Sequence, residues 1–556
     1  MRLIAICFFV FTTITTVAQE RVKKVEFYGV SKTNILHQGY EVDGDTMNIS
    51  KANYGHSLID LGILLRPSAS TEIATELRLR NELGGFWGGA VSYGIRKLTL
   101  KGVVNDAIRY KVGDLDLEMT PYTLYNNDYQ DVVNEATVYQ MAREVIDYEH
   151  YYNGNAWRQQ GVQSNFGFDL NSATFKSLDV ALFSTRNKVA DAASASPERL
   201  LSGGQMGFNT LYGLLMFHSV NLHDLKNTVN DLNLYYNSVN TVSATVNLPE
   251  LPKFSLHYEG GTSKANYEDL TEDETLTIQD YFWNLGLSFA PSESIKLSVN
   301  GINTGPQFRS PSAQNVRLGY SSSSNVFPTL GNNLAVRNMG LLDYLYNDVL
   351  YYNTFDNQLD AYNPAFSNVM PYGLATPNRK GFSVSLDEFT IKEQLNLSSD
   401  LYIMSEIIGS GTSALKSFMK FVAKADYDYK KWSVNAGLSY ESTSRDGQAY
   451  EAIELTSMLF DFGLDFDLSE NISLLWGTKY HTADGNELLA VYDSYNDPLY
   501  FEPTSYSDNH QMLNSIGLMV NFNERSTLTA SASSFVQQAE QEYKINQFQL
   551  LYRLNF

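Results

Sequence analysis

The stretch QFQLLYRLNF, residues 547–556, is the most informative part of the sequence for the fold. Two sets of side chains alternate along it. The apolar set is Phe548, Leu550, Tyr552, Leu554 and Phe556, and the polar set is Gln547, Gln549, Arg553 and Asn555, with Leu551 as the one exception. Because successive side chains of a β-strand point to opposite faces, the stretch predicts a strand with one apolar and one polar face.

The same alternation recurs upstream, for example in Trp283–Phe289, Trp432–Tyr440 and Phe460–Leu468. A soluble sandwich places its apolar face inward, whereas a membrane barrel places it outward, so the alternation alone fits both. The connections between strands favour the barrel. From Phe382 onward, tight turns alternate with longer polar stretches, as they do when short turns lie at one end of a barrel and long loops at the other. The tight turns are Ser398-Ser399, Lys430-Lys431, Ser469–Asn471 and Asn523–Arg525, and the longer stretches are Gly409–Ser417, Ser442–Ala452, Thr482–His510 and Gln537–Tyr543.

We therefore predict an all-β fold, a transmembrane antiparallel up-and-down barrel formed by residues 19–556. At the ~9–11 residues that a tilted spanning strand needs, it should have roughly 16 to 22 strands, in even number, with long extracellular loops and periplasmic termini. The closing strand with its terminal Phe556 resembles the C-terminal recognition strand of bacterial outer-membrane barrels. This resemblance implies an assembly signal for the barrel-assembly machinery, formed by Phe548, Leu550, Tyr552, Leu554 and Phe556.

The first residues have the pattern of a secretory signal peptide. Arg2 supplies a positive charge, Leu3–Ile14 is apolar, and Thr16-Val17-Ala18 offers small residues for cleavage. We predict a signal peptide over residues 1–18, cleaved after Ala18. Its removal takes away Cys7, the one cysteine of the sequence, and with it any disulfide or cysteine-ligated metal. The predicted location is the outer membrane of a Gram-negative bacterium, in contact with its lipid and lipopolysaccharide.

Charge and motifs narrow the range of functions. The formal net charge of −22 argues against nucleic acid as a partner, because phosphate binding needs clustered Lys and Arg. The sequence contains no HExxH, GxSxG or phosphate-loop motif, so we expect neither an enzyme nor a cofactor. One acidic run offers oxygen ligands for calcium but lacks the spacing of an EF-hand, which favours a solvated loop tip; it contains Glu268, Asp269, Glu272, Asp273 and Glu274.

Two connections are long, near residues 122–160 and 305–381. Both are rich in aromatic residues, and Leu341–Tyr352 could form a short amphipathic helix. Loops of this length are usually functional or disordered, and we expect them to fold over or into the pore. The alternative is that their aromatic side chains pack on each other above the barrel. Strand-like alternation begins near Val22–Val30, so we expect no plug domain before the barrel and no energy-coupled transport.

Charged residues on the polar faces of strands should line the lumen. The candidates are Asp461, Asp465, Asp467, Lys479, His481 and Arg553. A hairpin centred on residue 470 predicts that Asp461 lies opposite Lys479. The leading hypothesis is a porin-like channel for small or oligomeric solutes, with lumen carboxylates that mildly favour cations.

The second hypothesis is a non-conducting platform or accessory subunit of a secretion or surface complex, with a protein partner at its extracellular loops. The Ala18-Gln19 cleavage context, the Tyr- and Asn-rich loops and the acidic charge resemble outer-membrane proteins of bacteria that use type 9 secretion. Ion conductance separates the two hypotheses.

Overall fold

The structure is a computed structural model. It describes residues 24–556 except for 43–49, 84–90, 128–133, 150, 152, 171, 192, 194–195, 227–232, 248–252, 271–273, 316–353, 361, 393, 449–450, 494, 496–497 and 539–541. The predicted signal peptide and the predicted helix at Leu341–Tyr352 therefore lie outside the described residues.

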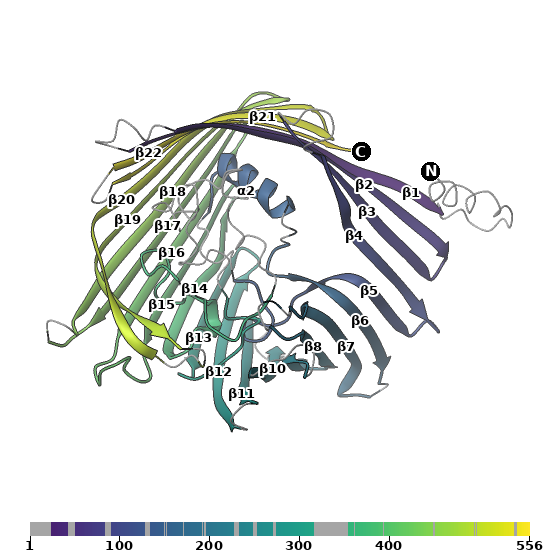
Figure 1. Ribbon diagram of the computed structural model, residues 1–556, viewed down its shortest axis with the longest axis vertical. Helices are drawn as coiled ribbons and strands as arrows, with labels where there is room; N and C mark the ends of the chain where they lie inside the picture. The colour runs from purple at the N-terminus through teal and green to yellow at the C-terminus, as the bar shows by residue number, and fades with distance from the viewer. Residues whose placement is uncertain are drawn as a thin grey trace.

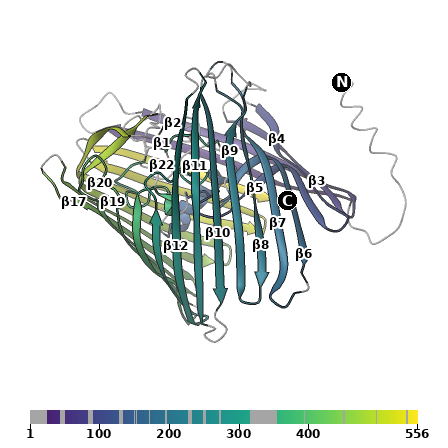
Figure 2. The same cartoon turned by 90° about the horizontal axis from the view of Figure 1, so that it is seen from below.

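Within the described residues, one sheet of 22 antiparallel strands closes on itself where β1 pairs with β22 (Figures 1 and 2). Each strand pairs with its neighbours in the sequence, and the number is even and lies at the upper limit of the predicted range. The strands are β1 Val25–Val42, β2 Ser50–Ser68, β3 Thr71–Glu82, β4 Val91–Val104, β5 Ile108–Leu117, β6 Trp157–Asp169, β7 Phe175–Lys188, β8 Arg199–Thr210, β9 Gly213–Asp224, β10 Asn233–Asn247, β11 Phe254–Asp269, β12 Glu274–Ser292, β13 Ile295–Thr304, β14 Arg379–Ile391, β15 Leu395–Ser405, β16 Ser417–Tyr429, β17 Trp432–Arg445, β18 Ile453–Ser469, β19 Ile472–Tyr492, β20 Pro498–Asn523, β21 Ser526–Gln538 and β22 Glu542–Asn555.

Short turns and long connections occupy opposite ends of the barrel. Each even-numbered strand from β2 to β20 leads into the next odd-numbered one through a short turn, and these turns lie at the end that holds β1's start and β22's end. We call this the terminal end. The segments between β5 and β6 and between β13 and β14 both begin and end at the opposite end. This parity separates a barrel from a sandwich, as the sequence predicted.

Two predicted connections are wrong in detail. Ser398-Ser399 lies inside β15, and the chain turns earlier, where Lys392 has a φ of 54°. Thr482–His510 is not a loop: β19 has 21 residues and β20 has 26, and they form one long hairpin. These lengths exceed the ~9–11 residues that cross a membrane. The hairpin therefore extends past the lipid, where its outer face need not be apolar.

The polarity of the barrel is the reverse of that of a soluble protein, with apolar side chains outside and polar ones inside. Outward side chains such as Leu285, Val299 and Ile516 are exposed, whereas inward ones such as Asp60, Lys479 and Gln511 are almost fully buried. An apolar exterior around a polar interior is the arrangement of transmembrane barrels. Closure lets every strand hydrogen bond to two neighbours, which lipid requires of a sheet.

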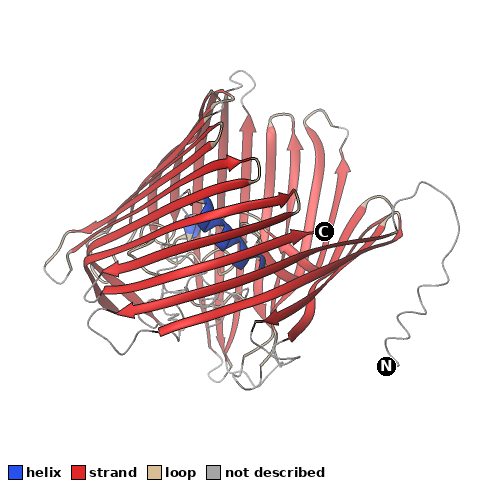
Figure 3. Cartoon of the chain, turned by 90° about the horizontal axis from the view of Figure 1, so that it is seen from above, coloured by secondary structure: helices blue, strands red, loops and turns tan. Residues whose placement is uncertain are grey.

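The interior of the barrel is occupied by two segments. Residues 118–156, between β5 and β6, carry helix α2 (Thr137–Glu149) inside the ring of strands (Figure 3). Described parts of residues 305–378, between β13 and β14, also lie inside, and Phe308, Phe355 and Val369 are fully buried. The prediction of a barrel without a plug is therefore wrong. The long connections contain apolar side chains and make polar contacts with the inner wall, so they fold into the barrel. In the described part of the chain, no helix has the length and apolarity to span a membrane.

Candidate functional site: an inserted helix in the lumen

Helix α2 is amphipathic and buries one face against the barrel wall. Val138, Ala142, Val145 and Ile146 recur at the three- and four-residue spacing of one helix face, and all are buried. At 1.5 Å per residue the helix is about 20 Å long. It contacts β18, β19 and β20. It therefore lies along the wall inside the barrel.

The wall supplies carboxylates at the N-terminal end of α2. The backbone N–H of Ala136 donates to Asp461 Oδ1 at 3.3 Å, and Thr137 Oγ1 donates to Asp465 Oδ2 at 2.6 Å. Both acids come from the inner face of β18. The first N–H groups of a helix lack partners within the helix, and its dipole favours negative charge there. Asp461 and Asp465 thus bind the start of α2.

Glu135, next to α2, is buried between two cations. Arg143 Nε donates to Glu135 Oε2 at 2.8 Å, and Lys479 of β19 hydrogen bonds to Glu135 Oε1. Burial alone would raise the pKa of Glu135. The charges of Arg143 and Lys479 outweigh burial and lower this pKa to about 2. The carboxylate is therefore ionised at neutral pH, and it fixes the helix start to the wall.

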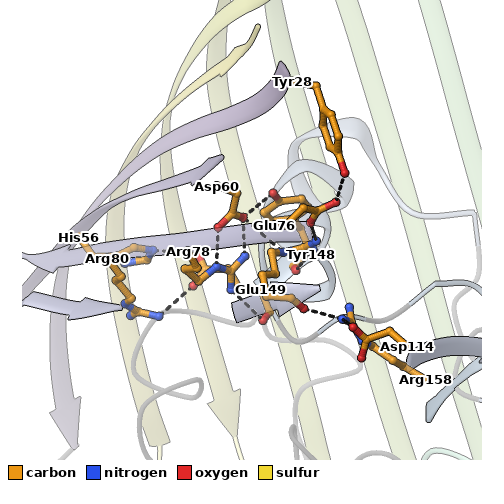
Figure 4. A network of polar contacts seen from close by, with 11 residues as sticks. Tyr28, His56, Asp60, Glu76, Arg78, Arg80, Asp114, Tyr148, Glu149 and Arg158 are labelled. Atoms are coloured by element: carbon orange, nitrogen blue, oxygen red, sulfur yellow. Dashed lines mark hydrogen bonds and ion pairs between the residues drawn. The ribbon is translucent and has the colours of Figure 1, made fainter. Parts of the chain in front are cut away.

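Guanidinium groups bind the C-terminal end of α2 (Figure 4). Arg96 Nη2 donates to the carbonyl of Tyr148 at 3.0 Å, and Arg78 Nη1 donates to that of Glu149 at 3.3 Å. The last carbonyls of a helix lack partners within the helix, and the dipole favours cations there. The charges of the wall therefore match the polarity of the helix at both ends.

Asp60 of β2 is the centre of this second cluster. It accepts a bidentate pair from Arg78, with Nε at 2.8 Å and Nη2 at 2.7 Å, and it also accepts the hydroxyl of Tyr148 at 2.5 Å. Arg96 Nε lies 3.3 Å from the same carboxylate. The ring of Tyr148 is covered by the Lys32 ammonium at 3.8 Å, a cation–π distance.

Glu149 forms a further anchor at the end of α2. Its carboxylate lies 2.8 Å from His56 Nε2 and accepts Arg80 Nη1 at 3.0 Å. Burial acts to raise the pKa of Glu149, but the contacts with His56 and Arg80 outweigh it and lower that pKa. Sequence reasoning missed these arginines. The stretch Leu77–Arg80 alternates apolar and basic residues, so the charges on the polar face of β3 were visible there.

The second inserted segment is held by another polar cluster. The backbone N–H of Asn368 donates to Glu441 Oε2 at 2.8 Å, and its side chain donates to Glu487 Oε2 at 2.6 Å. Both acids are also paired with wall lysines, Lys420 with Glu441 at 2.8 Å and Lys416 with Glu487 at 2.6 Å. The attachment thus uses wall charges that are already neutralised in pairs.

The two segments also pack on each other. Ser310 Oγ donates to the carbonyl of Tyr122 at 2.8 Å, and Asn127 Nδ2 donates to that of Ala313 at 2.6 Å. The ring of Tyr122 stacks on Phe282 of β12 at 3.8 Å between centroids. The described parts of residues 118–156 and 305–378 therefore form one internal obstruction.

The predicted lumen residues all lie on inward faces, and they have different neighbours. Asp461 is directly opposite Lys479 in the β18–β19 ladder, which confirms that predicted pair. Asp467 accepts Ser473 Oγ at 2.6 Å. His481 Nε2 lies 2.8 Å from the carbonyl of Ala365. Arg553 Nη1 lies 3.8 Å from Glu144 of α2, and both side chains are well exposed.

The other predicted sites fall at the barrel surface and at a hairpin tip. Phe548 of β22 and Phe556, directly after β22, are exposed, and Leu550, Tyr552 and Leu554 of the same set are half-buried. Their recognition by an assembly machinery stays a prediction. Of the acidic run, Glu268 and Asp269 end β11 and Glu274 begins β12, whereas Glu272 and Asp273 lie outside the described residues. Glu268 pairs with Lys226 at 2.6 Å. Among the residues described, no group of three His, Cys, Asp or Glu could hold a metal.

The lumen stays accessible at the terminal end, beside β2 to β9. Two cavities open there, of about 460 and 640 Å³. Both are lined by Arg109 of β5 and Asn165 of β6, so they adjoin each other. The inward residues Asn165, Asp169 and Asp179 are exposed. The inserted segments therefore leave an open vestibule on this side of the barrel.

A closed barrel with an even number of strands, an apolar exterior and a polar interior matches bacterial outer-membrane proteins. The chain is a closed β-barrel of the transmembrane type. No protein-family model matches it, and no curated protein matches its sequence.

Solved outer-membrane proteins are similar to this barrel in architecture. The FrpB iron transporter from Neisseria meningitidis aligns at 8% identity and a TM-score of 0.46, over 96% of this chain and 82% of that one. The ferric-catecholate import receptor Fiu from E. coli aligns at 10% and 0.45, over 94% and 82%. OpdQ from Pseudomonas aeruginosa aligns at 10% and 0.35, over 96% and 99%.

The expected cation preference of the lumen is not supported. It rested on Asp461, Asp465 and Asp467 as free carboxylates. Asp461 instead faces Lys479 and the start of α2, and Asp465 binds Thr137. The alternation of the strand gave their direction correctly, but it could not reveal that a helix occupies the space they face.

Proposed function

We propose that this barrel is a gated transport channel for small or oligomeric solutes, in which the inserted segments are the movable obstruction. The observation that carries the proposal is the way α2 is held. Both of its ends bind the wall through charged and polar groups, and the same lumen has an open vestibule at the terminal end.

Polar attachment suits a part that moves. When α2 leaves the wall, the charged groups at its two ends become exposed to water, which solvates them well. The apolar cluster that contains Val138, Tyr139, Leu475 and Leu513 becomes exposed too, at about 25 cal/mol per Å². The apolar face thus also holds α2, whereas the charged anchors at both ends can be released without a hydrophobic penalty.

A platform that does not conduct is the second candidate, and one observation favours it. Phe355 of the second segment packs edge-on against Trp157 at 5.2 Å between centroids, and its carbonyl accepts Arg199 Nη1 at 2.8 Å. This apolar cluster, which also contains Leu115, Leu201 and Tyr267, holds its segment against the wall. On this reading the inserted segments serve to stiffen a support for a protein partner at the loops.

Conductance of the purified barrel in planar lipid bilayers separates the candidates. We expect the native barrel to be mostly closed and the combined Lys479→Met and Asp60→Asn variant to open more often, because each end of α2 loses one of its charged anchors. Lys296→Met is the matched control, since Lys296 is an exposed lysine with its own acid at 3.9 Å, away from α2.

The folded state of each variant must be checked by heat-modifiable migration on gels. A variant that migrates as a folded barrel and stays closed contradicts the channel and supports the platform. The same preparation tests the predicted processing, because a mature chain that starts at Gln19 places cleavage after Ala18. Protease accessibility of the two termini in intact cells tests their periplasmic location.

A further inference from the structure

A basic cavity lies in the vestibule at the terminal end. It has a volume of about 460 Å³ and is lined by residues of β2 to β6 and of the turn between β2 and β3. Its cationic lining residues are Arg66, Lys101, Arg109 and Lys111, and its one acid is Glu72. A local excess of positive charge is unexpected in a chain whose net charge is −22.

The strand register shows that the cations share the inner face. Glu72 has the same parity on β3 as Arg78, which binds α2 inside the barrel. Lys101 lies directly opposite Glu72, and Lys111 lies directly opposite Lys101 on the next strand. Like charges that face each other across a ladder are destabilising. The ammonium groups of Lys101 and Lys111 therefore repel each other, which lowers the stability of this strand pair.

The available acid does not neutralise this group. Glu72 binds Lys101 at 2.6 Å and also Arg66 at 3.2 Å, so one carboxylate serves two cations. Within the part of the chain that the structure describes, neither Arg109 nor Lys111 forms an ion pair. Across the ladder on β6 they face Asn165 and Gln163, which are neutral. Two cations are thus left to face the cavity.

The arginines around α2 provide a contrast within the same barrel. Arg78, Arg80 and Arg158 are bound to Asp60, Glu149 and Asp114 respectively. There the sequence provides an acid for each guanidinium. At the basic cavity it provides amides instead, which can donate hydrogen bonds to an anionic ligand.

We propose that the basic cavity binds a small multivalent anion, with carboxylate or phosphate groups that bridge Arg109 and Lys111. The proposal deepens the transport function and rests on it for its biological meaning, since it names the solute class that the vestibule admits. Arg109 is suited to bidentate pairing with either group, and Lys111 adds a point charge. Gln163 and Asn165 complete the donor set.

Calorimetric titration of the purified full-length barrel with citrate and, separately, pyrophosphate tests the site without requiring transport. We expect saturable binding of at least one anion, and the stronger of the two identifies carboxylate or phosphate as the group recognised. The combined Arg109→Gln and Lys111→Gln variant should bind at least about tenfold more weakly, because it loses two charge-assisted contacts. Lys296→Gln is the control and should bind as the native barrel does.

Three results would overturn the site: no binding of either anion, equal binding by the double variant, or an equal loss in the Lys296→Gln control. Heat-modifiable migration of the double variant verifies that it is folded. Anion binding by the native barrel, together with a folded Lys479→Met and Asp60→Asn variant that does not conduct, would refute the channel and leave the anion site standing. Conductance without anion binding would refute the site and leave the channel standing.

Discussion

Asp461 and Lys479 face each other across the β18–β19 ladder, with Oδ2 and Nζ 3.5 Å apart and both side chains almost fully buried. The same ammonium also binds Glu135 of the inserted segment. One lysine thus joins a pair within the wall to the start of α2. Its loss would leave two buried carboxylates without their shared cation.

Lys479→Met should therefore release the N-terminal end of α2. Breaking a buried ion pair from one side typically costs about 3–5 kcal/mol, because the remaining charge stays buried. We expect a lower temperature for the heat-induced gel shift and more frequent opening in bilayers. The control Lys296→Met should change neither. An unchanged shift temperature would mean that Glu135 and Asp461 find other partners.

Acid should weaken the same anchor. The pKa of Glu135 is lowered from 4.5 to about 2 in the folded protein. A carboxyl group with a lowered pKa contributes stability that is complete above its unfolded pKa and is lost as the pH falls through the folded one. Opening should thus rise between about pH 4.5 and pH 2, with no change from this group between pH 7 and 5. Glu135→Gln should remove this component from a conductance titration, and an identical titration in that variant would contradict the assignment.

The hairpin around residue 470 shows that the register of neighbouring strands could be predicted from the sequence. The alternation of Phe460–Leu468 and the turn at Ser469–Asn471 fixed the pairing of Asp461 with Lys479. Register follows from such patterns because a slip of one residue would turn every apolar side chain inward. The predicted turn at Ser398-Ser399 failed because β15 has serines on both faces, so composition there resembled a turn.

The contents of the lumen were harder to predict. A period of two shows which side chains point inward, but not what they meet. The helical spacing of Val138, Ala142, Val145 and Ile146 was readable, yet it stood inside an acidic, Tyr-rich connection that suggested a loop. The roles of Asp461 and Asp465 depend on contacts with residues over 300 positions away, which no local pattern encodes.

Small residues of the wall allow α2 to approach, and enlarging one should displace it. A Cβ added at Gly477 would lie 2.8 Å from Tyr139 Cε2 and 2.8 Å from Val138 Cγ1. Gly477→Val should therefore push the helix away and increase conductance without changing any charge. Gly207→Ala is the control, since its added Cβ would meet nothing closer than 3.7 Å. A closed and folded Gly477→Val barrel would show that α2 tolerates a shift without opening a path.

Asp60→Asn should loosen the other end of α2. Asp60 is bound by Arg78, Arg96 and Tyr148, so the substitution leaves two guanidiniums short of one acid. We expect a loss of about 3–5 kcal/mol, as for other buried pairs broken from one side. Glu198→Gln is the matched control, because its partner Arg186 is half exposed and such pairs contribute only about 0–1 kcal/mol. Equal shift temperatures for the two variants would contradict the central role of Asp60.

Phe556 extends the β1–β22 ladder that closes the barrel. Its backbone N–H donates to the carbonyl of Gly29 at 3.0 Å, and its carbonyl accepts the N–H of Gly29 at 2.9 Å. Its ring lies over Gly29, where an added Cβ would come within 2.5 Å of Cζ.

Deleting Phe556 should sharply lower the amount of heat-modifiable protein in the outer membrane. Gly29→Val should lower it as well, because it displaces the ring. Gly39→Val, in the same strand, should not, since no atom lies within 4 Å of the Cβ position there. Unchanged membrane levels after deletion would place the assembly signal elsewhere in the barrel.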